Sequence, residues 1–356
     1  MSLKLVNLVG ARPQFIKAAT LSRWLRRQAG VEEILIHTGQ HFDRNMSAVF
    51  FEELALPVPD HQLNIHSLPH GAMTGRMLEA LESLFQQIQP NALVVYGDTN
   101  STLAGALAAA KLQIPIAHVE AGLRSFNRAM PEELNRILTD QISDWLFVPS
   151  QIAKDHLLNE GRPADSIYLC GDIMRDSVEH YRRQLTGQAA LAGLGLPDEF
   201  VLATLHRQEN LRDTERLKNI FEGLGQLNRA IKVVLPVHPA LKPVLPASAQ
   251  ALHLIEPQPY LSMLNLIDQS RLVLTDSGGL QKEAYYFQKF CLTLRDETEW
   301  TELVGAGANI LAGADPLVIE QKASEFLHKS FTIDPNLYGR GDTADQIGQI
   351  LLSSKG

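Results

Sequence analysis

Short runs of apolar residues alternate with longer amphipathic segments along almost the whole chain. Each apolar run has the length of a buried strand, and each amphipathic segment has the apolar spacing of a helix that covers a sheet. Strands and helices that alternate in this way predict parallel sheets with right-handed crossovers, a doubly wound α/β architecture. The predicted strands are Leu3–Val9, Glu33–His37, Ala92–Tyr96, Ile114–His118, Trp145–Val148, Ile167–Cys170, Phe200–Thr204, Lys232–Pro236, Leu252–Ile255, Leu272–Leu274 and Phe290–Leu294, and the predicted helices include Leu78–Ile88, Leu134–Ile142 and Thr214–Leu227.

The series of strands restarts after Gly171-Asp172, which indicates two domains. A charged segment and a stretch containing glycine and proline separate the two series, and 356 residues exceed what one core usually holds. We predict a first domain over residues 1–172 and a second over residues 173–340. Residues 341–356 form a C-terminal helix that could pack on either domain.

Composition narrows the class of protein. The hydrophobic content of 45% and the charged content of 20% are typical of a globular protein. A net charge of −8 argues against a nucleic-acid partner, and no apolar run reaches the ~18 residues that span a bilayer. Cys170 and Cys291 lie in apolar runs without a CxxC pair, so we expect buried, reduced thiols. These features predict a cytoplasmic protein without a membrane partner.

Charged residues crowd the segment that follows the predicted strand at 114–118. Open α/β sheets bind ligands where strands end, and buried charges are costly unless they are paired or used. The segment therefore predicts a functional site rather than an ordinary surface loop. Its members include Glu120, Arg124, Arg128 and Glu132.

Two further strand-to-helix turns carry candidate chemistry. Gly10 permits a tight turn, and Arg12 and Lys17 then lie near a helix N-terminus, where an anion is favoured. Asp98 follows the strand at 92–96 and is either a functional carboxylate or the N-cap of the next helix. The turn at Gly10 could instead be an ordinary capped turn, with Arg12 and Lys17 merely solvated.

In the second half, Ser277-Gly278-Gly279 joins a buried strand to a helix and allows a phosphate to approach the backbone. Glu283 lies about one turn into that helix and could accept hydrogen bonds from a ribose diol. His206 and His238 each follow a predicted strand of the same sheet. The chain has neither a P-loop ending nor a GxGxxG after a strand, and no metal-ligand spacing, so neither a nucleotide cofactor nor a metal is implied.

With these motifs in hand, the chain resembles the non-hydrolysing UDP-N-acetylglucosamine 2-epimerases. The segments that carry the resemblance cover nearly the whole chain and stand in family order: GARPQFIK, HTGQHFD, YGDTNST, HVEAGLRS, PEELNR, TLHRQEN, PVHP and TDSGGLQKEA. The resemblance implies two Rossmann-like domains of GT-B type with a UDP-sugar in the cleft between them, no cofactor, and a homodimer. It also implies that the C-terminal helix returns to the first domain.

The family's chemistry explains the residue types. UDP is eliminated across C1–C2 to give a 2-acetamidoglucal and then re-adds with inversion at C2, which converts UDP-GlcNAc to UDP-ManNAc. Two acid/base groups with tuned pKa values are needed on opposite faces of C2. By resemblance the candidates are Asp98, Glu120 and Glu132, with His206 near the departing phosphate. Which carboxylate is the base stays open.

The resemblance also implies substrate contacts. Arg12 and the Ser277-Gly278-Gly279 helix start would stabilise the diphosphate. The remaining matches are Lys17, His238, Gln258, which is expected near the uracil, and Glu283.

Some positions depart from the best-known branch of the family. Trp300 stands in place of an arginine contact, and Asp43 replaces a glutamine linked to allosteric binding of UDP-GlcNAc. The segments 125–128 and 295–300 look more like the branch that acts on UDP-2,3-diacetamido-2,3-dideoxy-glucuronic acid. In that alternative, Arg124 and Arg128 select an acidic sugar, or Arg128 merely pairs with Glu132.

Two other classes of function compete with an epimerase. A retaining glycosyltransferase of the same fold would bind a nucleotide sugar but would not need three carboxylates around C2. A nucleotide-sugar binding protein with an inactive site would not need them either.

Overall fold

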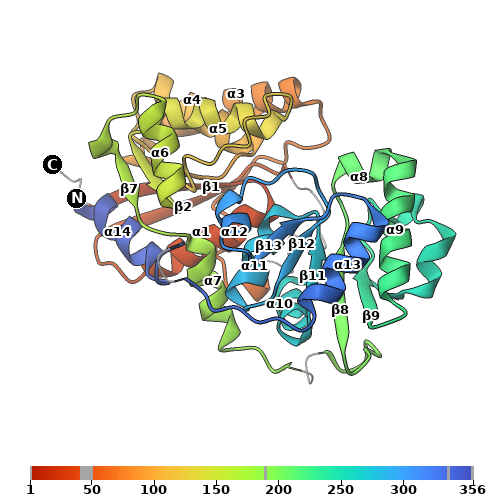
Figure 1. The fold of residues 1–356 in the computed structure, drawn as a ribbon. Coiled ribbons are helices and arrows are strands. Elements are labelled where there is room, and N and C mark those ends of the chain that lie inside the picture. Colours follow the sequence, from red (N-terminus) through yellow and green to blue (C-terminus); the bar gives the residue numbers. More distant parts are fainter. Residues whose placement is uncertain (1, 41–50, 188–190, 335–336, 354–356) are drawn as a thin grey trace. The chain divides into compact units, whose positions relative to one another are not determined.

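The computed structural model describes residues 2–40, 51–187, 191–334 and 337–353, and Figure 1 shows its ribbon. The chain divides into two compact units. Unit 1 comprises residues 1–179 and 335–356, and unit 2 comprises residues 180–334. Both units are α/β, with parallel strands alternating with helices, so the predicted fold class is confirmed.

Unit 1 is built on a seven-stranded sheet in the order β3-β2-β1-β4-β5-β6-β7. Its strands all pair in parallel, as the sequence pattern predicts. Its elements are β1 (Leu3–Val9), α1 (Arg12–Leu25), β2 (Val31–His37), β3 (His61–Gln62), α3 (His70–Ile88), β4 (Ala92–Tyr96), α4 (Asn100–Lys111), β5 (Ile116–Val119), α5 (Pro131–Ile142), β6 (Trp145–Val148), α6 (Gln151–Asn159), β7 (Ile167–Leu169), the first part of α7 (Ile173–Arg182) and α14 (Thr343–Ser353).

Unit 2 has a six-stranded parallel sheet in the order β10-β9-β8-β11-β12-β13. Its elements are β8 (Phe200–Thr204), α8 (Gln208–Arg212), α9 (Thr214–Leu227), β9 (Lys232–Pro236), β10 (His253–Ile255), α10 (Tyr260–Gln269), β11 (Val273–Thr275), α11 (Gly278–Tyr286), β12 (Cys291–Thr293), α12 (Thr301–Gly305), β13 (Asn309–Leu311) and α13 (Pro316–Phe326).

Each sheet has one point at which the strand order reverses. In unit 1 it lies between β1 and β4, and in unit 2 between β8 and β11. Loops that leave the carboxyl ends of two such strands turn to opposite faces of the sheet and open a crevice, where α/β proteins bind ligands. The predicted site residues follow β1, β4 and β5 in one unit and β8, β9, β10 and β11 in the other.

Five strands have the bounds that the sequence predicts, namely β1, β4, β6, β8 and β9. The predicted strand at 114–118 instead begins at Ile116, after Pro115, which has no N–H to donate to a sheet. The strands β3 and β13, of two and three residues, are not predicted by the sequence. Strand bounds elsewhere differ by one or two residues.

The division between the units falls inside α7, at 179/180, seven residues beyond the predicted 172/173. The first part of α7 is bound to the C-terminal segment within unit 1. Arg175 donates to the carbonyl oxygen of Gly339, and Asp176 Oδ2 accepts a hydrogen bond of 2.8 Å from Ala344 N at the start of α14. Helix α14 packs on α1 (Figure 1). The approach is so close that a Cβ on Gly348 would lie 2.2 Å from the Trp24 ring.

Both cysteines are free and buried, as the sequence predicts. Burial raises the pKa of the Cys170 thiol and of the Cys291 thiol to about 12, so both stay protonated at neutral pH. Among the described helices, none is long and apolar enough to cross a membrane.

Candidate functional site

The turn after β1 is shaped by a close approach. A Cβ on Gly10 would lie 2.1 Å from Ser101 Oγ, so glycine is required there for space. The side chain of Gln14 accepts hydrogen bonds from Gly10 N and Ala11 N, at 2.7 and 3.0 Å. Arg12, predicted to contact the diphosphate, is half-buried at the first position of α1.

Lys17 and Glu120 form a buried ion pair. The Lys17 ammonium donates to Glu120 Oε2, and the two side chains are only 7% and 8% exposed. Glu120 follows β5 in a left-handed backbone conformation, with φ of +71°, which is strained for a residue other than glycine. Such strain is typical of a functional site, and the neighbouring ammonium favours the ionised form of the carboxylate. The pairing also places Lys17 against a protein carboxylate, where the sequence predicted a substrate contact.

Asp98 follows β4 and is not the cap of α4. The cap is Thr99, whose hydroxyl accepts from Thr102 N. The Asp98 carboxylate instead pairs with Arg136, and its backbone oxygen accepts a hydrogen bond of 2.9 Å from Asn135 Nδ2. Burial among protein groups raises the pKa of Asp98; Arg136 opposes this, and the charge of Glu120 adds to it.

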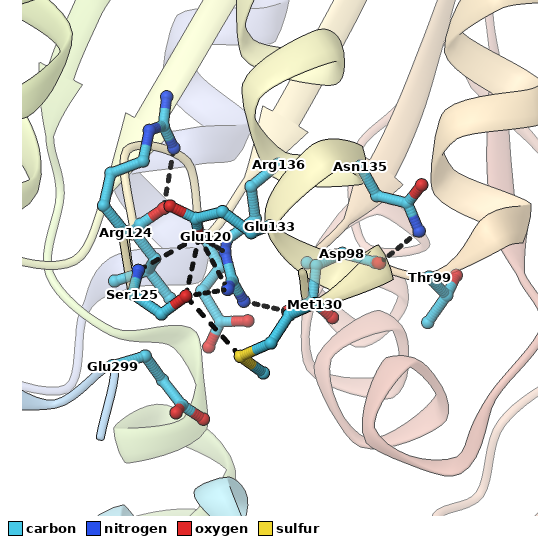
Figure 2. A network of polar contacts seen from close by, with 12 residues as sticks. Asp98, Thr99, Glu120, Arg124, Ser125, Met130, Glu133, Asn135, Arg136 and Glu299 are labelled. Carbon is cyan, nitrogen blue, oxygen red and sulfur yellow. Dashed lines mark hydrogen bonds and ion pairs between the residues drawn. The ribbon is translucent and has the colours of Figure 1, made fainter. Parts of the chain in front are cut away.

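Glu132 and Glu133, at the start of α5, differ in their surroundings. Glu132 is half-buried, and its negative charge also raises the pKa of Asp98. Glu133 is buried and binds Ser125 N, Phe126 N and Arg136 Nη2 at 2.8 to 3.0 Å. Burial alone would raise the pKa of Glu133, but these donors lower it. Figure 2 shows Arg136 between Glu133 and Asp98, so one guanidinium joins the loop after β5 to the turn after β4.

Arg124 has a different role from the predicted one. Its side chain is 1% exposed and donates to both carboxylate oxygens of Glu160, at 2.7 and 2.6 Å. It also lies 2.7 Å from Asp140 Oδ2 and donates to Leu123 O. Because nearly all of its donors are used inside the protein, Arg124 cannot be the arginine that binds a sugar carboxylate. Arg128 lies on the same loop and is exposed.

In unit 2, Asp276 organises the turn after β8. This buried carboxylate lies 3.0 Å from His206 Nδ1 and accepts hydrogen bonds from the backbone of His206 and Arg207 and from Asn210 Nδ2. Burial would raise the pKa of Asp276, but His206 and the backbone donors lower it. The arrangement orients the imidazole of His206, whose side chain is 37% exposed. His238 is half-buried, with its ring centroid 5.5 Å from that of His206.

The turn after β11 has a space at its second glycine. Ser277 caps α11, and a Cβ on Gly278 would lie 2.3 Å from Glu299 Oε1, whereas a Cβ on Gly279 would meet nothing within 4 Å. Glu283 is buried on α11. Gln258, predicted near the uracil, lies half-buried just before α10 and donates to Glu256 O.

At Trp300, where the sequence departs from the best-known branch, the indole is buried. The ammonium of Lys282 lies 4.0 Å from the centroid of its ring. Trp300 thus packs against a buried cation of α11. Asp43, the other departure, lies outside the described residues. Among the residues that the structure describes, no group of three or more His, Cys, Asp or Glu side chains could hold a metal ion.

Fold and site together define a class of protein: a two-unit α/β enzyme of nucleotide-binding type, with polar side chains at the switch point of each parallel sheet. The chain belongs to the UDP-N-acetylglucosamine 2-epimerase family, whose model matches residues 23–352. It is therefore an isomerase, a nucleotide-sugar 2-epimerase, and the rival interpretation as a glycosyltransferase is set aside.

The relatives cover essentially the whole chain. UDP-2,3-diacetamido-2,3-dideoxy-D-glucuronate 2-epimerase of Pseudomonas aeruginosa is 51% identical over 98% of this chain and 99% of its own length. UDP-N-acetylglucosamine 2-epimerase of Methanocaldococcus jannaschii is 41% identical over 99% of this chain and 100% of its own. The crystal structure of that archaeal enzyme in complex with UDP-GlcNAc and UDP has a TM-score of 0.93, at 41% identity, over 99% of this chain and 100% of that one.

Some partners of the site were not predicted from the sequence. Asp276, Glu133 and Arg136 lie inside the motifs TDSGG and PEELNR, yet motif spacing does not show which side chains they bind. The signal that could have found them is the density of charge beside buried strands, since buried charges require partners.

Proposed function

We propose that this enzyme interconverts UDP-2-acetamido sugars that are epimeric at C2, by elimination and re-addition of UDP. The C2 proton leaves to a base and the C1–O bond breaks, its electron pair leaving with UDP and a C1=C2 double bond forming. UDP then attacks C1 again as a proton returns to the opposite face of C2. Residues of unit 1 act on the sugar and residues of unit 2 bind UDP.

The observation that carries this proposal is the contrast between Asp98 and Glu120. They follow neighbouring strands, yet Lys17 favours the ionised form of Glu120, while burial raises the pKa of Asp98. Two carboxyl groups whose surroundings shift their proton affinities differently can divide the work of base and acid. We therefore assign Glu120 as the base and Asp98 as the acid of one direction, with the roles exchanged in reverse. Glu132 lies close enough to tune Asp98.

The nucleotide is assigned to unit 2. The capped start of α11, with open space at Gly279, offers backbone N–H groups to a diphosphate. His206, oriented by Asp276, is placed to donate to the leaving phosphate oxygen, and Glu283 to bind the ribose.

The test is solvent isotope exchange. The purified enzyme, incubated with a UDP-2-acetamido sugar in D2O without any acceptor, is expected to place deuterium at C2 and to yield both epimers, as followed by NMR. Turnover without deuterium at C2 would contradict the mechanism.

For the substrate, the uronic acid is the better candidate. Relatives named for UDP-N-acetylglucosamine support UDP-GlcNAc, but the 51% identical relative is named for UDP-2,3-diacetamido-2,3-dideoxy-D-glucuronate. The exposed guanidinium of Arg128, on the loop between Glu120 and Glu132, can pair with a C6 carboxylate as Arg124 cannot.

Arg128→Ala is expected to lower kcat/KM for the uronic-acid sugar by about tenfold or more, the effect of losing a charge-assisted pair. The same change should leave kcat/KM for UDP-GlcNAc nearly unchanged, because that sugar has no carboxylate. Arg27→Ala, an exposed arginine elsewhere in unit 1, is the matched control for a lost arginine. Equal losses on both sugars would exclude recognition of the carboxylate by Arg128.

We also propose, from the family, a homodimer in the cytoplasm. The two free, buried thiols support a reducing compartment.

A further inference from the structure

His118 lies in β5, two residues before the candidate base Glu120, and contacts no solvent. It is the third residue of β5, and its side chain is 0% exposed. Both ring nitrogens are in contact with oxygen atoms. Nδ1 lies 2.7 Å from Asp140 Oδ1, and Nε2 lies 2.8 Å from the carbonyl oxygen of Gly97.

These contacts determine where the protons of the ring lie. A carbonyl oxygen only accepts hydrogen bonds, so Nε2 must carry a proton. Asp140 is already an acceptor, because Gly122 N donates to its Oδ2 at 3.2 Å and Arg124 Nη1 lies 2.7 Å away. Nδ1 therefore faces an acceptor.

The surrounding groups make Asp140 an acceptor for the ring. Burial would raise the pKa of Asp140, but His118 and Arg124 lower it, which favours the ionised carboxylate. Arg124, whose side chain is 1% exposed, lies 2.7 Å from Asp140 Oδ2 and also pairs with Glu160, whose side chain is 29% exposed. The carboxylate can therefore accept from Nδ1 on its other oxygen.

The Nε2 hydrogen bond reaches the peptide directly before Asp98. Gly97 has a φ of +60°, its N–H donates to Val119 O at 3.0 Å, and its oxygen accepts from His118. The turn that presents Asp98 is thus held from both sides by β5, the strand that also leads into Glu120.

We propose that His118 is a positioning residue, whose Nε2–H sets the placement of Asp98 relative to Glu120. Asp140 holds the other ring nitrogen, so the carboxylate pair of the reaction depends on a buried residue that never touches the substrate. The kinetic part of this inference rests on the proposed function.

Two matched variants separate positioning from general stability. The amide nitrogen of Gln can occupy the place of Nε2, and that of Asn the place of Nδ1. Each variant loses one of the two ring contacts, and both are expected to be less stable. His118→Gln keeps the donor to Gly97 O and should retain most of the kcat for C2 deuterium exchange.

His118→Asn lacks that donor and should lose about tenfold to a hundredfold in kcat with little change in KM, as expected when a reacting group is displaced. Equal losses in kcat for the two variants, or a smaller loss for His118→Asn, would overturn the positioning role.

The hydrogen bonds of the ring are tested on the wild-type enzyme by NMR with 15N-labelled histidine. We expect one ring whose Nε2–H is protected from exchange with solvent, whether or not a substrate is bound. A buried ring without a protected Nε2–H would overturn the hydrogen bond to Gly97 O on which the positioning role rests. If the wild type exchanges C2 hydrogen on no UDP-2-acetamido sugar, the proposed function fails, whereas this measurement still decides the state of His118.

Discussion

Asp98 and Glu120 show how similar residues can be given different electrostatic surroundings by their partners. Both are acidic side chains at the carboxyl ends of adjacent strands, β4 and β5. Lys17 pairs with Glu120 and Arg136 with Asp98, yet Asp98 retains its proton to higher pH than usual, because desolvation outweighs the guanidinium. The motif indicates that carboxylates are present, and the partners determine their protonation states.

Asp98→Asn is expected to reduce kcat for C2 exchange by about a hundredfold or more, the usual loss when an acid/base group is removed. Because the pKa of Asp98 is raised, the wild-type profile of kcat/KM against pH should also contain a group that titrates above the ordinary aspartate range, and the variant should lack it. Asp155→Asn, an exposed change on α6, is the control. A variant with an unchanged pH profile would contradict the assignment.

Spacing along the chain does not reveal which arginine is available to a ligand. Arg124 and Arg128 stand four positions apart in one charged segment, and the sequence assigned both to the sugar. The structure buries Arg124 against Asp140 and Glu160, residues 16 and 36 positions further along the chain, and leaves Arg128 exposed. Only folding brings those carboxylates to one guanidinium.

At the scale of elements, the attachment of helix α14 to unit 1 involves an aspartate of α7, Asp176. Asp176 Oδ2 accepts a hydrogen bond from Ala344 N, a backbone donor of the first turn of α14. Desolvation raises the pKa of Asp176 to about 7, although hydrogen bonds from Ala344 and Thr343 oppose the change. In the unfolded chain the group has its ordinary acidic pKa. The folded protein therefore binds one more proton than the unfolded chain between about pH 4 and pH 7.

Because folding favours the protonated form of Asp176, the attachment of α14 is expected to weaken as pH rises from about 4 to about 7. The loss should be at most about 4 kcal/mol, because each tenfold change in an acid dissociation constant corresponds to about 1.36 kcal/mol. We expect protection factors of α14 amides, measured by hydrogen exchange, to fall from pH 5 to pH 8 in the wild type. Asp176→Asn, which keeps the acceptor, should remove most of that fall. Asp165→Asn, an exposed change in the same unit, should not.

A steep pH dependence that persists in Asp176→Asn would show that another group is responsible. Global stability would be a poorer measure, because a chain with two compact units need not unfold in one step.

Across the molecule, the two units repeat one plan. Each has a parallel sheet with a switch point, and each places its polar residues on the loops that leave the strands there. This repetition explains why the motifs that carry chemistry are spread over most of the printed sequence, from the turn after β1 to the turn after β11. Accordingly, the family model matches residues of both units, over the range 23–352.

The α/β class, most strands and the family follow from the sequence alone, and so do the strand-end turns proposed to carry chemistry. Apolar runs and strand-end motifs are local patterns, and local patterns can be recognised without coordinates. Which charges meet is decided by folding. Lys17 and Glu120 are 103 positions apart, and His118 on β5 reaches Gly97, which follows β4. Such pairings depend on the order and register of strands in the sheet, which no short segment encodes.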